Sequence, residues 1–169
     1  MLLGHKGLPK GHEHRRRDAN LKSMLNHFPK AVPEIPVSNV QKAAEYYVNA
    51  LGFHLDWHNA EYGIAAVSQG ECRMFLSDAP FRQGYGTVGP VMVWLNLNTK
   101  LEVDELYHRW RRAGAKTLDE PEDKPWRLRE FRIADPDGNQ LRVFFDFTWE
   151  TRPDGTDHSV HTRPDGLPE

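Results

Sequence analysis

The sequence predicts an α+β fold made of two βαβββ modules. Two observations lead to this prediction. A stretch with helical spacing of apolar residues that ends at a glycine occurs twice, at Gly52 and at Gly114. Each stretch follows one short strand-like run and precedes several more, which are separated by turn residues. Because the order of elements is the same in both halves, we infer that the chain of 169 residues contains one module twice, as an internal repeat.

The first half opens with a short apolar run, Val32–Val37, whose two prolines suit an edge strand. Ser38 and Asn39 then form a good N-cap pair for a helix that ends before Gly52. Turn residues divide the rest of this half into three expected strands, at Phe53–His58, Tyr62–Ser68 and Glu71–Ser77.

The second half repeats this order, beginning with a strand at Val91–Leu97. One helical stripe follows, formed by Val103, Leu106, Tyr107 and Trp110. A tight turn is expected at Asp135-Pro136-Asp137-Gly138, because proline presets φ and glycine accepts a positive φ. The remaining strands are expected at Ala115–Leu118, Trp126–Ala134 and Asn139–Phe147.

Charge divides the chain into five expected segments. Residues 1–30 form a polar arm with seven Lys and Arg residues against two acids, and residues 148–169 form a tail with five acids against two arginines. Between them lie the first module at 31–80, a linker at 81–90 and the second module at 91–147. We expect both ends to be solvated extensions, so nucleic acid is not an expected partner of the basic arm.

Composition excludes several classes of protein. The mean hydropathy is −0.70, and no apolar stretch approaches the roughly 18–20 residues of a membrane span. The single cysteine, Cys72, excludes an internal disulfide framework and suits the cytoplasm, where we expect the protein to be. Cys72 is interpreted as a core thiol, not as a nucleophile. The sequence contains no P-loop, nucleophile elbow or dinucleotide-binding glycine motif.

Three pairs of segments, spread in this order over about 115 residues, carry a resemblance to a known family. They are Ala31–Val40 with Glu45–Phe53, Val91–Leu95 with Val103–Tyr107, and Lys124–Phe131 with Asp135–Phe144. Together they resemble the glyoxalase / bleomycin-resistance / dioxygenase (vicinal oxygen chelate) superfamily. The run Pro-Trp … Arg-Glu-Phe followed by Asp-Pro-x-Gly-Asn is especially similar to the bleomycin-resistance branch.

The resemblance implies that each sheet curves into a half-open cup with its helix packed outside. Strand alternation then assigns side chains to the helix side or to the cup. Aromatic rings in the cup could stack on a planar ligand, and the carboxylates could receive a cation. Alternatively, the aromatic residues only pack a dimer interface. The expected ligand-binding residues in the cup are Glu34, Phe75, Trp94, Trp126, Glu130, Arg142 and Phe144.

The resemblance also implies where the enzymes of the superfamily hold a divalent metal, on the first and last strands of each module. The matching positions here are Val32, Phe75, Met92 (or Val91) and Arg142, none of which can bind a metal. We therefore expect no cofactor and no catalytic residue. The expected function is to sequester a flat or cationic small molecule, such as a glycopeptide antibiotic.

Two other functions stay open from the sequence. One is a metal-dependent lyase, isomerase or dioxygenase of the same superfamily, which would need an unusual site built from Glu34, Glu130 and a histidine such as His54 or His58. The other is a structural or regulatory protein whose arm and tail bind a partner.

Two expectations concern assembly and charge. Neither cup is closed by one module, so we expect a homodimer with Val32–Val37 at or near the interface, or exchanged between chains.

A buried guanidinium without a partner is costly. We therefore expect Arg142 to fill the vacated metal space and to pair with Glu34, on a neighbouring first strand, or with Glu130.

Overall fold

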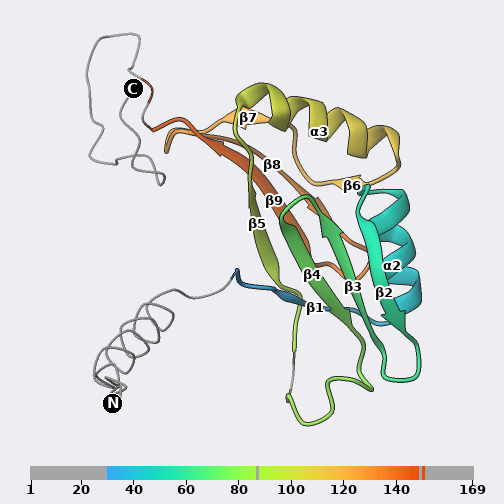
Figure 1. Cartoon of the computed structure of the whole chain (residues 1–169). Coiled ribbons are helices and arrows are strands. Elements are labelled where there is room, and N and C mark those ends of the chain that lie inside the picture. The colour runs from blue at the N-terminus through green and yellow to red at the C-terminus, as the bar shows by residue number, and fades with distance from the viewer. Residues whose placement is uncertain (1–29, 87, 149, 151–169) are drawn as a thin grey trace, which may run out of the picture. The chain divides into compact units, whose positions relative to one another are not determined.

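The computed structural model describes residues 30–86, 88–148 and 150. The elements, shown in Figure 1, are β1 (Glu34–Pro36), α2 (Val40–Asn49), β2 (His54–Asn59), β3 (Ile64–Gln69), β4 (Cys72–Ser77), β5 (Met92–Asn96), α3 (Lys100–Arg112), β6 (Lys116–Thr117), β7 (Glu122–Asp123), β8 (Leu128–Ala134) and β9 (Gln140–Asp146). Neither helix in this part of the chain is long and apolar enough to cross a membrane. The expectations for most of the basic arm and acidic tail fall outside the described residues.

The strands form two mixed sheets with the same plan. The first has the order β1-β4-β3-β2, and the second has the order β5-β9-β8-β6 with β7 also paired to β8. In each sheet the first strand runs parallel to the last, and the later strands are antiparallel. This arrangement confirms the prediction of two βαβββ modules.

The second module differs from the prediction in one strand boundary and one additional strand. The long strand begins at Leu128, not at Trp126, because Arg127 has a φ of 65° and closes a turn in which its N–H donates to the carbonyl of Lys124 at 2.9 Å. Strand β7 was not predicted, since two residues are too short to show a period.

The helix ends follow from local side-chain chemistry. The side chain of Asn39 accepts from the N–H of Lys42 at 2.9 Å, as expected for an N-cap. Thr99 caps α3 in the same way by accepting from the N–H of Glu102 at 3.1 Å. After the second helix, Gly114 adopts a φ of +89°, a conformation that L side chains rarely take, which confirms it as the helix terminator.

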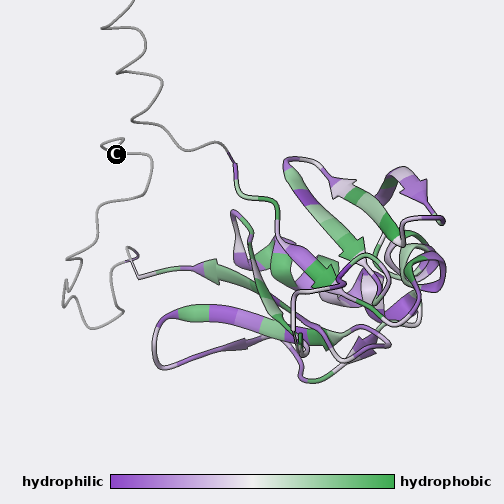
Figure 2. Ribbon diagram, turned by 90° about the horizontal axis from the view of Figure 1, so that it is seen from below, coloured by the Kyte–Doolittle hydropathy of each residue, from purple (hydrophilic) through white to green (hydrophobic). Residues whose placement is uncertain are grey.

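One hydrophobic core serves both modules. Along β9 every second side chain is buried, and in β4 Met74 and Leu76 are buried on the helix side; Figure 2 shows the alternation of hydrophobic and hydrophilic residues along the strands. The indole N–H of Trp110 in α3 donates to the carbonyl of Leu51, after α2, at 2.7 Å. The core therefore joins the helices of the two modules. Its fully buried members include Tyr47, Met74, Leu76, Val103, Phe131, Leu141 and Val143.

A buried carboxylate at the β8–β9 turn joins the modules a second time. The carboxylate of Asp135 accepts from four donors: the backbone N–H groups of Asp137 and Asn139, the side-chain amide of Asn139, and the hydroxyl of Tyr47 in α2. Burial raises the pKa of Asp135, and the hydrogen bonds from Asn139 oppose that shift.

Asn139 extends this network to both first strands. Its amide N–H donates to the carbonyl of Pro36 in β1 at 2.8 Å, and its amide oxygen accepts from the N–H of Val91, just before β5, at 3.0 Å. The predicted Asp-Pro-Asp-Gly turn therefore also fixes the two modules to each other.

We expect Asn139→Ala to lower the free energy of unfolding by about 1–3 kcal/mol, because it leaves buried polar groups of Pro36, Val91 and Asp135 without partners. Urea denaturation would measure the change. The matched control is Asn98→Ala, at an exposed position just before α3, which should cost under about 0.5 kcal/mol. Equal losses in the two variants would contradict the role given to Asn139.

Candidate functional site

We call the face of each sheet that points away from the helices its cup face. On the cup face of the first sheet, a row of side chains runs across all the strands. The register aligns Glu34, Phe75, Ala66 and Trp57. The rings of Phe75 and Trp57 lie with their centroids 5.7 Å apart, tilted by 49°. The sheet therefore brings together two of the expected ligand-binding residues, Glu34 and Phe75. Trp57, which was not expected there, lies beside them.

Trp57 was not among the predicted site residues, and strict alternation from Leu55 would place it on the helix side, because β2 contains a bulge. The register shifts between Leu55 and Trp57, so Asp56 is the extra residue and Trp57 turns to the cup. Asp56 is held at the bulge by the Ser68 hydroxyl at 2.6 Å and by Arg73 at 3.0 Å. The sequence gives no signal for such a bulge.

The expected pair between Glu34 and Arg142 is not formed. Strand β1 pairs with β4, whereas β9 lies between β5 and β8 in the other sheet, so the two residues are not on neighbouring strands. Glu34 instead accepts from the hydroxyl of Ser77 at 2.7 Å, and that hydroxyl also accepts from Arg82 at 3.2 Å.

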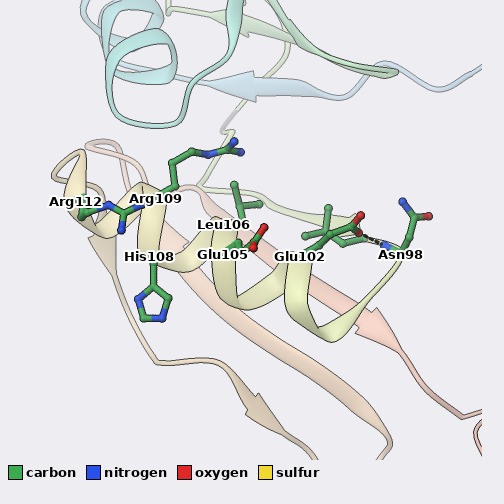
Figure 3. Close-up of a pocket in the computed structure, with 8 residues that line it drawn as sticks. Asn98, Glu102, Glu105, Leu106, His108, Arg109 and Arg112 are labelled. Atoms are coloured by element: carbon green, nitrogen blue, oxygen red, sulfur yellow. Dashed lines mark hydrogen bonds between the residues drawn. The ribbon is translucent and has the colours of Figure 1, made fainter.

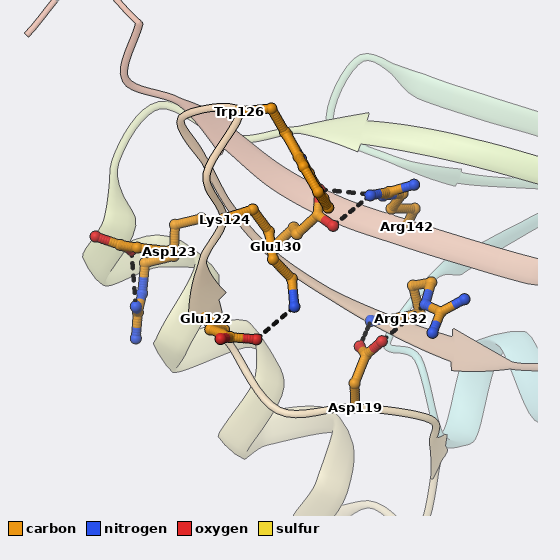
Figure 4. A network of polar contacts seen from close by, with 9 residues as sticks. Asp119, Glu122, Asp123, Lys124, Trp126, Glu130, Arg132 and Arg142 are labelled. Carbon is orange, nitrogen blue, oxygen red and sulfur yellow. Dashed lines mark hydrogen bonds and ion pairs between the residues drawn. The ribbon is translucent and has the colours of Figure 1, made fainter.

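The cup face of the second sheet is organised around Arg142. Its guanidinium forms a two-bond ion pair with the carboxylate of Glu130, as Figure 4 shows, which confirms the other expected partner. The guanidinium lies 4.2 Å from the ring centroid of Trp94 and 6.0 Å from that of Trp126. The position between the two tryptophans, where we expected a ligand, is thus occupied by a side chain of the protein.

Hydrogen bonding and packing hold both tryptophans in place. The indole N–H of Trp126 donates to Glu130 at 3.3 Å, and the ring of Trp94 meets that of Phe144 edge-on at 5.5 Å. The side chains of Arg142 and Glu130 are only 19% and 5% exposed, whereas Trp94 is 48% and Trp126 55% exposed. A buried ion pair therefore supports two open aromatic surfaces.

This fold has counterparts among known proteins. Residues 25–143 match the Glyoxalase/Bleomycin resistance protein/Dioxygenase superfamily. The chain belongs to this superfamily. Proteins named bleomycin resistance protein from Geobacillus stearothermophilus and Staphylococcus aureus are 29% identical to it over 126 residues, 68% of this chain and 94% of each relative.

Solved structures of the superfamily share the fold. A glyoxalase/bleomycin resistance protein/dioxygenase from Nocardioides has a TM-score of 0.59 and 24% identity, covering 77% of this chain and 92% of that one. The bleomycin resistance determinant encoded on the transposon Tn5 has a TM-score of 0.56 and 20% identity, covering 71% and 99%.

The four positions that the resemblance assigns to the metal ligands of the superfamily's enzymes carry side chains that do not suit a metal. Val32, Phe75 and Met92 offer no side-chain nitrogen or oxygen atom, and the guanidinium of Arg142 is a hydrogen-bond donor that is bound to Glu130. The strand register places Arg142 across from Trp94.

The unusual alternative site is not assembled either. Glu130 is engaged by Arg142, His54 contacts Asp56 at 3.3 Å, and the register turns His58 toward the helix side. Within the described ranges, no group of three or more His, Cys, Asp and Glu side chains could hold a metal ion.

A separate hollow of about 590 Å³ lies along α3 and contains none of the predicted site residues. Figure 3 shows the side chains that line it, including Glu102, Leu106 and Arg109 on successive turns of the helix. In it Glu102 accepts from the N–H of Asn98 at 2.7 Å, a contact that stabilises the start of α3.

We expect Glu130→Ala to lower the free energy of unfolding by about 3–5 kcal/mol, because it leaves the guanidinium of Arg142 largely buried without a carboxylate. Chemical denaturation would measure this loss. Replacing Glu130 and Arg142 together by Leu and Met should restore much of the stability.

Glu34→Gln is the control for this prediction, because a glutamine oxygen can still accept from Ser77 and no ion pair is lost. Its cost should stay under about 1 kcal/mol. If Glu34→Gln lowers the free energy of unfolding as much as Glu130→Ala does, the special role given to Glu130 is contradicted.

Proposed function

We propose that this protein binds and sequesters a planar small molecule, such as an antibiotic, on its cup faces without chemically altering it. The observation that carries the proposal is the pair of half-exposed tryptophans, Trp94 and Trp126, fixed on the buried ion pair of Arg142 and Glu130. A planar ring can stack on such surfaces, which contributes about 0.5–1.5 kcal/mol beyond the burial of apolar area.

Pre-organisation supports binding at this site. The hydrogen bond of Trp126 to Glu130 and the contact of Trp94 with Phe144 fix the two indoles before any ligand arrives. Ordering these side chains therefore costs little at the moment of binding. Trp57 and Phe75 offer a second aromatic surface on the other sheet.

Two further points favour sequestration over catalysis. Relatives that are 29% identical over nearly their whole length are named bleomycin resistance proteins. In addition, Arg142 stands at a position where the superfamily's enzymes are expected to carry a metal ligand, and a fixed cation there opposes a second one.

We propose a neutral or anionic ligand in place of the cationic one expected from the sequence. A cationic ligand was expected because of Glu34 and Glu130. Glu130 already accepts both bonds of Arg142 and one from Trp126, so a cation would have to displace the guanidinium. A planar neutral or anionic ligand meets no such competition.

We also propose that two copies form a homodimer in the cytoplasm that closes the cups, with β1 at or near the interface or exchanged. The support is the number of large apolar side chains left 39–48% exposed just before β1 and on the strands β2 and β5: Val32, Trp57, Met92 and Trp94. Exposed apolar clusters of this kind are typical of interfaces.

Ligand binding can be tested with a set of aromatic antibiotics that includes bleomycin and neutral, cationic and anionic compounds. We expect saturable quenching of tryptophan fluorescence by at least one of them and recovery of the compound unchanged. Trp94→Ala should weaken binding about three- to tenfold, matching the energy of one stacked ring.

Dialysis against EDTA should leave this binding unchanged, and elemental analysis of protein without a polyhistidine tag should show well under one metal per chain. Conversion of the bound compound, or a stoichiometric metal needed for binding, would overturn the proposal. Trp110→Phe serves as the control variant, because Trp110 is buried in the core and faces no ligand.

The dimer predicts a mass of twice one chain in multi-angle light scattering at micromolar concentration. Trp94→Glu should shift the population toward monomers, because a carboxylate would replace an apolar ring at the centre of the cup. A monomeric mass for the unsubstituted protein across this range would argue against the dimer.

A further inference from the structure

Two arginines stand directly opposite each other on the cup face of the second sheet. The register of β8 and β9 pairs Arg132 with Arg142. Side chains paired in this way have Cβ atoms about 4.5–5.5 Å apart, and like charges placed so are destabilising. This arrangement therefore needs an explanation.

Each guanidinium is oriented by one carboxylate on its outer side. Arg142 uses Nε and Nη2 to bind Glu130, and Arg132 uses Nε to bind Asp119 at 2.7 Å. Nη1 of Arg142 and both Nη atoms of Arg132 make no hydrogen bond to the part of the chain that the structure describes. Figure 4 shows each guanidinium beside its carboxylate, Arg142 with Glu130 and Arg132 with Asp119.

The surroundings of this pair add an aromatic wall and an unused acceptor. Trp94 lies across from Arg142 on β5, with its ring 4.2 Å from the guanidinium. Gln140 lies two residues before Arg142, on the same face of β9, and its side-chain oxygen is buried with no hydrogen-bond partner among the described residues. Such a group is costly unless a donor reaches it.

We propose that the planar ligand carries an anionic group, a carboxylate, sulfonate or phosphate, which lies across Arg132 and Arg142 while the ring stacks on Trp94. An anion relieves the repulsion between the two guanidinium groups and takes the N–H donors that the protein leaves unused. An N–H or O–H beside the anionic group donates to the oxygen of Gln140. This inference rests on the proposed function and narrows its ligand class.

A matched pair of probes tests the proposal. 1-Anilinonaphthalene-8-sulfonate and N-phenyl-1-naphthylamine share one ring system and differ in the sulfonate. We expect the sulfonate to bind at least about tenfold more tightly, and this advantage to shrink as salt is raised, because exposed charges are screened.

Arg132→Gln is the informative variant, since Arg132 is 40% exposed and its loss should leave the fold intact. It should weaken the sulfonate about tenfold and leave the neutral probe within about twofold. Arg109→Gln, on the exposed side of α3, is the charge-matched control and should change neither probe. Circular dichroism and urea denaturation would confirm that both variants fold.

The outcomes separate this inference from the proposed function. Equal binding of the two probes, with Trp94→Ala weakening both and Arg132→Gln changing neither, would overturn the anionic ligand and leave aromatic sequestration standing. If neither probe nor any antibiotic binds, the proposed function fails and the inference fails with it.

Discussion

The carboxylate of Asp135 is the contact on which the rest of the molecule depends. Three of its four donors come from Asp137 and Asn139 and close the turn between β8 and β9, so they fix how these strands pair, while the fourth, the hydroxyl of Tyr47, ties the turn to α2. A slip of one residue in this pairing would turn every side chain of β9 to the opposite face, which would send Arg142 into the core. The geometry of the cup is therefore set at one end of the hairpin, by a residue that never faces a ligand.

The ion pair of Arg142 with Glu130 has a different role. Taking both charges out of water costs free energy that their attraction only partly recovers, so two apolar side chains would serve stability at least as well. Apolar residues, however, could not fix the orientation of the neighbouring polar side chains. Glu130 binds the guanidinium and the indole N–H of Trp126 together, so one carboxylate fixes the position of a cation and of an aromatic ring.

Much of this arrangement could be predicted from the sequence. Alternation placed Trp94, Arg142 and Phe144 on the cup face because β5 and β9 are regular strands. The same rule would put Trp57 on the wrong face, since the bulge at Asp56 adds a residue without a sequence signal. Alternation also says nothing of which strands are neighbours, so the choice between Glu34 and Glu130 needed the sheet order. That Arg142 fills the space between the tryptophans depends on its side-chain conformation, which only the folded structure determines.

The bulge has a consequence for colloidal behaviour. Strand β2 is one edge of its sheet, and a straight edge bearing Leu55 and Trp57 would be a template for pairing with other chains. Asp56 breaks the straight edge with a charge, and the hydroxyl of Ser68, with His54 and Arg73, lowers the pKa of this carboxyl. The charge at the edge is therefore kept to a lower pH than that of an ordinary aspartate. On this basis the native fold should resist fibril formation under acidic storage better than its exposed tryptophans suggest.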